Sequence, residues 1–243
     1  MTEKLFYEDS HMVTFSATVV SCEQSGEVYE VVLDRTAFFP EGGGQYADTG
    51  RLDDAKVTDV QEKAGSSYHK TNQAVEIGKT VQGTIDWEER FSKMQQHSGE
   101  HIVSGIVHAV YGYDNVGFHM GKDAITMDFN GSISKEELKV IERKANEAVV
   151  KSLDIKVLYP AKEELDSIAY RSKIEIEGQV RIVEIPGYDV CACCAPHVKK
   201  TGEIGLIKLL NVQNYKGGVR ISMLCGFRAL QDYEQKAESV KKI

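Results

Sequence analysis

The sequence predicts a mixed α+β fold in two domains, a small β-barrel over residues 1–87 and an α+β domain over 88–243 in which a sheet packs on a long helix. Three observations support this prediction. The first third of the chain holds short β-branched runs separated by turn residues. The hydrophobic period changes to that of a helix just after Trp87, and beyond this point helical and strand patterns alternate.

The first domain contains four runs rich in Val, Ile and Thr, with turn residues such as Gly65-Ser66-Ser67 between them. The runs are Thr14–Ser21, Tyr29–Leu33, Val57–Val60 and Val81–Ile85. Several short strands at this close spacing are typical of a small barrel. Residues 34–50 contain three successive glycines, which are costly inside a regular element, so this stretch is predicted to be a loop.

The second domain opens with a helix predicted over Arg90–Tyr111. Its apolar stripe recurs at helical spacing and consists of Ile102, Val103, Ile106, Val107 and Val110. A second helix is predicted from about Ser134, where the letters SKEE form a capping box, to about Ser152. The remaining elements are strands at Ile155–Tyr159, Val180–Ile185, Ile204–Val212 and Val219–Leu224, and a last helix over Ala229–Lys241.

Composition places the chain among globular proteins. It has 243 residues, 42% of them hydrophobic and 27% charged, with 21 Gly and only 4 Pro, which excludes collagen-like, disordered and coiled-coil classes. No apolar run approaches the roughly 20 residues of a membrane helix, and the N-terminus lacks the apolar stretch of a secretory signal. We therefore expect a cytoplasmic protein with no membrane partner.

The charge balance varies along the chain. A formal net charge of −8 argues against non-specific binding to nucleic acid. Residues 191–230, however, contain a single acid, Glu203. The bases in this segment are Lys199, Lys200, Lys208, Lys216, Arg220 and Arg228. The segment is either an ordinary solvated surface or a local basic patch.

Two histidines lie four residues apart in the motif HSGEH at 97–101. One helical turn separates His97 from His101, so both imidazoles project from one face, roughly opposite the apolar stripe. Such a pair is a common way to hold zinc. Two surface histidines can show the same spacing by chance, so the pair needs further ligands.

The motif CACCAPH at 191–197 supplies candidates for these ligands. Cys193 and His197 are also four residues apart, but Pro196 makes this segment a turn. Clustered cysteine and histidine in a cytosolic protein indicate a metal or a catalytic site rather than disulfides. Nitrogen and sulfur ligands in a set of four suit zinc, and we predict one zinc ion per chain. Its ligands are His97, His101, Cys193 and His197.

Other sulfur and imidazole groups leave some choices open. Cys191 and Cys194 compete with Cys193 for the sulfur position. His119 is predicted to lie in a loop and, like His69, is interpreted as an ordinary histidine.

Three motifs, in this order, resemble the editing domain of alanyl-tRNA synthetases and its free-standing relatives, the AlaX proteins. They are the loop RTAFFPEGGGQ at 35–45, the HSGEH pair, and the letters CCAPH at 193–197 with TGEIG at 201–205 behind them. The resemblance covers essentially the whole chain, whose length is similar to that of the medium AlaX class.

The resemblance implies a hydrolase that deacylates mischarged tRNA(Ala), mainly the seryl ester and secondarily the glycyl ester, while sparing alanyl-tRNA(Ala). A synthetic site shaped for alanine rejects serine and glycine only weakly, which is why editing is needed. The glycine loop is expected to close over the aminoacyl end, and the basic segment is expected to meet the acceptor end of the tRNA. The residues implied at the substrate are Thr36, Gly42, Gly43, Gly44 and Gln45, and those at the tRNA are Lys199 and Lys200.

The mechanism and the function class retain alternatives. Glu100 lies three residues after His97 and is a candidate general base, with an ordinary exposed helix acid as the other interpretation. HSGEH also matches the H-x-x-E-H signature of metalloproteases, with Glu175 or Glu177 as the third ligand. A zinc-stabilised module that binds tRNA without catalysis is a further hypothesis.

Overall fold

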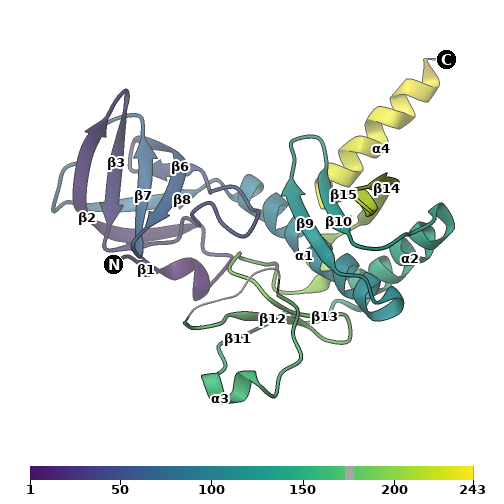
Figure 1. Ribbon diagram of the computed structural model, residues 1–243. Coiled ribbons are helices and arrows are strands. Elements are labelled where there is room, and N and C mark those ends of the chain that lie inside the picture. The colour runs from purple at the N-terminus through teal and green to yellow at the C-terminus, as the bar shows by residue number, and fades with distance from the viewer. Residues whose placement is uncertain (173–177, 243) are drawn as a thin grey trace. The chain divides into compact units, whose positions relative to one another are not determined.

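The computed structural model describes residues 1–172 and 178–242, and it divides into two compact units, Met1–Lys93 and Met94–Ile243. Each unit contains β-sheets, and the α-helices come after the strands of the first unit in the chain. The predicted mixed α+β class is therefore confirmed (Figure 1). Within the described residues, no helix combines the length and the apolar character needed to cross a membrane.

Six strands of the first unit close into a barrel (Figure 1). In hydrogen-bonded order they are β2 (Thr14–Ser25), β3 (Val28–Leu33), β7 (Ser66–Thr71), β6 (Ala55–Lys63), β5 (Gly50–Leu52) and β8 (Thr80–Ile85). A short parallel pair, β1 (Glu3–Lys4) with β4 (Arg35–Thr36), and a 3-10 turn at Leu5–Tyr7 accompany them. Strict alternation of buried and exposed residues along β8 is what a half-buried strand requires.

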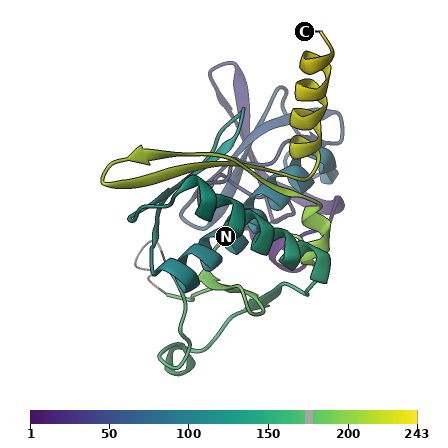
Figure 2. The same cartoon turned by 90° about the vertical axis from the view of Figure 1, so that its right-hand side faces the viewer.

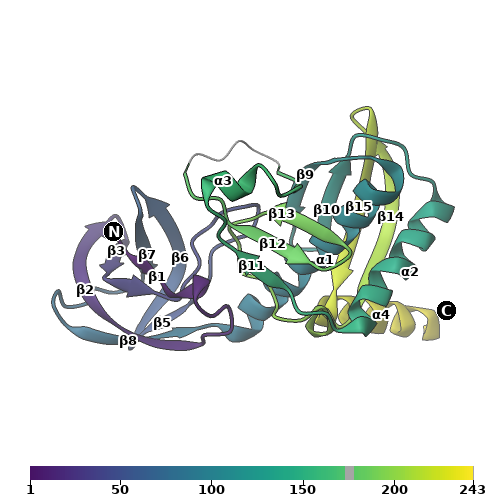
Figure 3. The same cartoon turned by 90° about the horizontal axis from the view of Figure 1, so that it is seen from below.

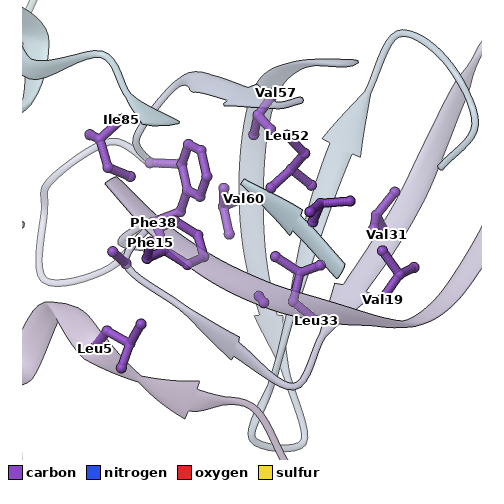
Figure 4. Packing of buried hydrophobic residues seen from close by; sticks show 14 residues of the cluster. Leu5, Phe15, Val19, Val31, Leu33, Phe38, Leu52, Val57, Val60 and Ile85 are labelled. Carbon is purple, nitrogen blue, oxygen red and sulfur yellow. The ribbon is translucent and has the colours of Figure 1, made fainter. Parts of the chain in front are cut away.

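The barrel is filled by apolar side chains from β2, β3, β5, β6 and β8 and from the loop after β4, as Figure 4 shows. Among the buried residues are Phe15, Val31, Leu33, Phe38, Leu52, Val57, Val60 and Ile85. The prediction that Gly65-Ser66-Ser67 is a turn was wrong for the two serines, because β7 begins at Ser66. Ser67 is fully buried, and the polar composition of β7 gives no hydrophobic pattern from which the strand could be read.

One polar pair sits inside this apolar core. His69 on β7 is fully buried, and its Nδ1 lies 2.9 Å from the carbonyl oxygen of Val31. A carbonyl only accepts, so Nδ1 carries the proton and Nε2 is the acceptor. Nε2 therefore receives the hydroxyl proton of Thr36, at 2.8 Å, while the same hydroxyl accepts the N–H of Phe38 at 3.1 Å. The interpretation of His69 as an ordinary histidine overlooked this bond to Thr36.

The second unit is built around α1 (Trp87–Tyr111), which begins in the first unit and continues through the second. Its other helices are α2 (Lys135–Lys151), the short α3 (Lys162–Leu165) and α4 (Gly226–Lys241). Ser134 caps α2, and both hydrogen bonds of the predicted capping box with Glu137 are present.

Two sheets complete the second unit. One has the order β14 (Ile207–Tyr215), β15 (Gly218–Cys225), β10 (Ile125–Phe129) and β9 (Asn115–Met120), and the other has the order β11 (Lys156–Leu158), β12 (Ile182–Ile185) and β13 (Asp189–Ala192). The β14–β15 hairpin extends well beyond its neighbours (Figure 2). Helix α2 runs along β14 (Figure 3). A 3-10 turn, Thr201–Ile204, precedes β14, so Ile204 lies outside the strand predicted to start there.

Two glycines let α1 approach its neighbours closely. A Cβ on Gly99 would meet the Sγ of Cys225 on β15, and a Cβ on Gly105 would meet the backbone oxygen of Tyr188 just before β13. These positions are six residues apart and lie about 120° apart around the helix, so the two sheets contact different sides of α1. This explains why almost every α1 residue from Met94 to Val107 is buried.

Two further local predictions in this unit were wrong. Val110, assigned to the apolar stripe of α1, is 49% exposed because it lies in the last turn, beyond the part of the helix that the sheets cover. His119, expected in a loop, is in β9, where it pairs with Thr126 of β10.

The buried His69 predicts a pH dependence of stability. Burial lowers the pKa of His69 to about 4, with the bond to Val31 acting in the opposite direction. The unfolded chain takes up a proton near pH 6.5 and the folded chain does not, so this stability is present above pH 6.5 and is lost as the pH falls towards 4. The loss attributable to His69 amounts to about 3 kcal/mol.

Urea unfolding of the wild type and of His69→Gln at pH 7 and pH 4.5 isolates this contribution, since all other titrating groups are shared. The wild type should lose more stability over this range than the variant. An NMR titration in which the imidazole of His69 protonates near pH 6.5 would contradict the prediction.

Candidate functional site

Four predicted ligand residues meet at one place in the second unit. His97 and His101 come from α1, and Cys193 and His197 come from the turn that follows β13. One donor atom from each lies within 4.8 Å of the others, a spacing suited to a metal ion. The Sγ of Cys193 is 3.6 Å from Nε2 of His97 and 3.4 Å from Nε2 of His197. The three imidazoles are buried, and Cys193 is partly exposed.

The turn at 193–197 is fixed by a single arginine. Arg181, just before β12, donates from Nη1 to the carbonyl oxygens of Cys193 and Ala195, at 2.7 and 2.9 Å. Its own carbonyl accepts the N–H of Cys193 at 3.1 Å. The backbone that carries the two ligand residues Cys193 and His197 is therefore hydrogen-bonded to the adjacent sheet.

The outer ring nitrogens of two histidines have fixed partners. Nδ1 of His101 is 2.9 Å from Oδ2 of Asp189, and Nδ1 of His197 is 3.0 Å from the hydroxyl of Ser98. Asp189 in turn accepts two hydrogen bonds from Arg171. A carboxylate on Nδ1 keeps the proton there and leaves Nε2 as the donor to a metal, which is how metal-binding histidines are usually oriented.

With no cation bound, the electrostatics favour a thiolate at Cys193 and a neutral ring at His197, but a protonated ring at His101. Burial acts to raise the pKa of Cys193, but the surrounding histidines outweigh it and hold this pKa well below the usual value. Burial lowers the pKa of His197 to about 3. Burial also disfavours a charged His101, yet the bonds to Asp189 and Cys193 raise its pKa. Zinc binds a thiolate and neutral imidazoles, so its binding would displace the extra proton of His101.

The two competing cysteines lie elsewhere. Cys194 is exposed, and its sulfur is not part of the group around His97. Cys191 is buried on β13, in a separate group with His101 and Asp189. Burial raises the pKa of Cys191, and Arg171 beside Asp189 places a positive charge where a second cation would have to bind.

Glu100 is not an exposed helix acid, because its side chain is buried with 1% exposure. Its Oε2 lies 3.8 Å from Nε2 of His101, on the side where the donor atoms meet. Its Oε1 accepts hydrogen bonds from Ser104 and Asn115. The carboxylate is therefore held beside the four ligand atoms of His97, His101, Cys193 and His197, which together form the donor cluster.

The glycine loop lies in the first unit. Gly42 and Gln45 exchange two backbone hydrogen bonds of 3.0 Å, and the residues between them, Gly43 and Gly44, have φ of +60° and +80°. Two positive φ values in succession define a tight turn that only glycine and a few polar residues form cheaply. Thr36 and Gln45 are both buried.

A buried ion pair anchors the base of this loop. Asp48 accepts hydrogen bonds from the N–H of Phe39 and from Nε of Arg90, at 2.6 and 2.8 Å. Arg90 also donates to the carbonyl oxygen of Ala37 at 2.6 Å. Both ends of the loop are therefore held by one arginine at the start of α1.

Carboxylates from other parts of the chain offset part of the positive charge of the basic segment 191–230. Lys199 and Lys200 are exposed, but Lys200 pairs with Asp154 at 3.1 Å. Two further bases of the segment have carboxylate partners from other parts of the chain. These pairs are Lys208 with Glu142 and Arg220 with Asp128.

Two predicted ligands cannot be located, and three residues that orient the ligand rings were not predicted from the sequence. Glu175 and Glu177, the third ligands of the metalloprotease hypothesis, lie outside the described residues. Ser98, Arg171 and Asp189 were not predicted. Their role depends on which strand and loop pack against α1, and only the position of Ser98 next to His97 offered a sequence signal.

Two family models match the chain. One is described as the threonyl and alanyl tRNA synthetase second additional domain and matches residues 180–222, and the other, class II (A) tRNA synthetases, matches residues 2–89. The alanyl-tRNA editing protein AlaX-M of Saccharolobus solfataricus is 36% identical over 237 residues, covering 91% of this chain and 98% of its own length. The chain belongs to the AlaX family of alanyl-tRNA editing proteins.

Longer proteins contain the same unit. AlaX-L of Pyrococcus horikoshii is 33% identical over 95% of this chain, which spans 59% of the length of that relative. The alanine–tRNA ligase of Natronomonas pharaonis is 38% identical over 98% of this chain, which spans 27% of that enzyme. The AlaX unit therefore recurs as a segment of larger enzymes.

The donor cluster of this AlaX chain predicts a ranking of cysteine variants. Cys193→Ala removes the only anionic donor among the four predicted ligands and should abolish zinc binding. Cys194→Ala is the matched control, because it changes the neighbouring sulfur and should leave about one zinc per chain. Metal analysis of the purified proteins checks this, and full zinc in Cys193→Ala would contradict the ligand set.

Proposed function

We propose that this chain is a zinc-dependent aminoacyl-tRNA hydrolase that deacylates mischarged tRNA(Ala). Its preferred substrate is the seryl ester, the glycyl ester is secondary, and alanyl-tRNA(Ala) is spared. The observation that carries the proposal is the cluster of three imidazoles and one thiolate in a chain of the AlaX family. We further propose that residues 1–87 form the domain with the glycine loop, that 88–243 form the editing domain, and that the protein acts in the cytoplasm.

The donor set fits zinc rather than a harder cation. Three nitrogens and one sulfur suit a tetrahedral zinc site, whereas magnesium and calcium prefer oxygen donors. When bound, zinc would polarise the ester carbonyl or orient the ester. The residues holding it would be His97, His101, Cys193 and His197, with Asp189 and Ser98 fixing two of the rings.

Glu100 is the proposed catalytic residue. Its buried carboxylate lies beside the donor cluster and can accept a proton from the water that attacks the ester. This role also explains why a buried acid is placed next to His101 instead of an apolar residue. The proton accepted from the water is then available to the 3′-terminal ribose oxygen as the ester bond breaks.

Discrimination against alanine is proposed for the glycine loop. Gln45, and the remaining acceptor capacity of the Thr36 hydroxyl, whose proton is bonded to His69, are the polar groups proposed to bond the extra hydroxyl of serine, which alanine lacks. A site built to bond a hydroxyl leaves buried polar groups unpaired when the hydroxyl is missing, which penalises alanine. Gly42, Gly43 and Gly44 give a turn whose backbone a substrate can approach closely.

The direct test is release of the amino acid from seryl-, glycyl- and alanyl-tRNA(Ala) side by side, with the full chain. We expect the seryl ester to be cleaved at least about tenfold faster than the alanyl ester, since one unpaired buried group costs about 1–3 kcal/mol. Glu100→Gln should keep zinc and lose most of the rate. Binding of tRNA without any release would support the non-catalytic module instead.

A substitution in the glycine loop tests selectivity. Gly43→Asn adds a side chain at a position with φ of +60°, which asparagine tolerates better than most residues. The turn should therefore survive, while seryl-tRNA(Ala) is cleaved more slowly or alanyl-tRNA(Ala) is no longer spared. Rates measured on both substrates decide, and wild-type values for both would show that the loop is only a connector.

The basic pair is proposed to contact tRNA phosphates. Reversing the charge of Lys199 and Lys200 should weaken binding of tRNA(Ala) and reduce the slope of affinity against salt concentration. Lys139 and Lys144, both exposed on α2 and outside the basic segment, provide a matched control double reversal. Unchanged tRNA affinity in the double variant, with zinc retained, would refute this contact.

A further inference from the structure

The start of β9 shows an inverted burial pattern. Asn115 is 6% exposed, whereas its neighbour Val116 is 64% exposed. A strand normally turns its valines inward and its asparagines outward, because burying an amide is costly and burying a valine is favourable. A polar group placed inside at the expense of an apolar one indicates a specific use for that group.

A β-bulge produces the inversion. Along β9, Phe118 contacts the ring of His97 and Met120 is buried, so these two residues point towards the core of the unit. Regular alternation would turn Val116 inward as well. The pairing with β10 instead steps from Gly117 to Asn115 and skips Val116. The extra residue directs the side chain of Asn115 inward.

The orientation of the Asn115 amide is determined by its partners. Its Oδ1 accepts the N–H of Gly117 at 3.0 Å, so Nδ2 is the end that points to α1. Nδ2 donates to Oε1 of Glu100 at 2.6 Å and to the hydroxyl of Ser104 at 2.8 Å. Ser104 donates its own proton to the same Oε1 at 2.7 Å.

Two donors thus converge on one oxygen of Glu100, and its other oxygen lies 3.8 Å from Nε2 of His101. Fixing Oε1 in this way removes rotation about the last bond of the side chain, because turning the carboxylate would break both hydrogen bonds. Hydrogen bonds to a buried carboxylate are among the stronger ones in proteins. They hold Oε2 on the side of the metal donors.

We infer that Asn115, with Ser104, is a positioning residue that aims the Glu100 carboxylate at the reacting water. This inference rests on the proposed function and extends it by a residue on a different element from either half of the metal site. Asn115 does not touch the donor cluster itself. Its effect on the reaction passes through Glu100 alone.

A pair of variants separates positioning from simple structural support. Asn115→Leu keeps the approximate size of the side chain and removes the donor to Glu100 without placing a second carboxylate beside it. We expect kcat for seryl-tRNA(Ala) to fall about tenfold or more, with KM and zinc content within about twofold of wild type. Val116→Ala, in the same bulge, is the control and should retain wild-type kcat.

A double-mutant cycle tests whether the effect passes through Glu100. If it does, Asn115→Ala lowers kcat when Glu100 is present but does not lower it further in the Glu100→Gln variant. Additive losses, or an unchanged kcat in both Asn115 variants while Glu100→Gln is slow, would overturn the inference and leave the proposed function standing. A wild-type chain that fails to cleave seryl-tRNA(Ala) would overturn both.

Discussion

The second unit is organised around one electrostatic requirement: a partly exposed thiolate and three buried imidazoles are brought within 4.8 Å of one another. Such a group is stable when a cation is bound between the donors, and costly when the donors face one another alone. The ordering of the surrounding elements follows from this. α1 is buried along its middle turns so that His97 and His101 lie inside. Gly99 and Gly105 allow the two sheets to approach closely, and Arg181 ties the Cys193 turn to the start of β12.

A second layer of interactions sets the direction in which each donor points. Asp189 and Ser98 hold the outer nitrogens of His101 and His197, and Arg171 neutralises Asp189. Glu100 is held in the same way, by Asn115 and Ser104. The first unit shows the same arrangement on a smaller scale, because the hydroxyl of Thr36 is held by His69 inside the barrel. In each case a buried polar group has a defined proton donor and acceptor, which fixes its geometry more firmly than packing alone.

The sequence was sufficient for features that depend on local spacing. The capping box at Ser134 and the end of α1 at Tyr111 follow from local patterns. The two halves of the ligand set were combined because four nitrogen and sulfur donors suit zinc. Features that depend on tertiary pairing could not be predicted. β7 is too polar to show a strand pattern. The sequence does not reveal that Lys200 forms an ion pair with Asp154. Glu100 looks like a surface acid unless the sheet that covers it is known. The bulge that turns Asn115 inward is set by the register between β9 and β10, and no spacing within β9 reveals it.

The central claim, that three imidazoles and one thiolate hold a zinc ion, is tested most directly by X-ray absorption at the zinc edge of the purified wild-type protein. The account predicts about one zinc per chain in a four-coordinate shell, with one sulfur at roughly 2.3 Å and three nitrogens at roughly 2.0–2.1 Å. Two or more sulfurs in the shell would place Cys191 or Cys194 in the site and contradict the donor set. A protein that retains no zinc and cannot be loaded with it would contradict the claim as a whole.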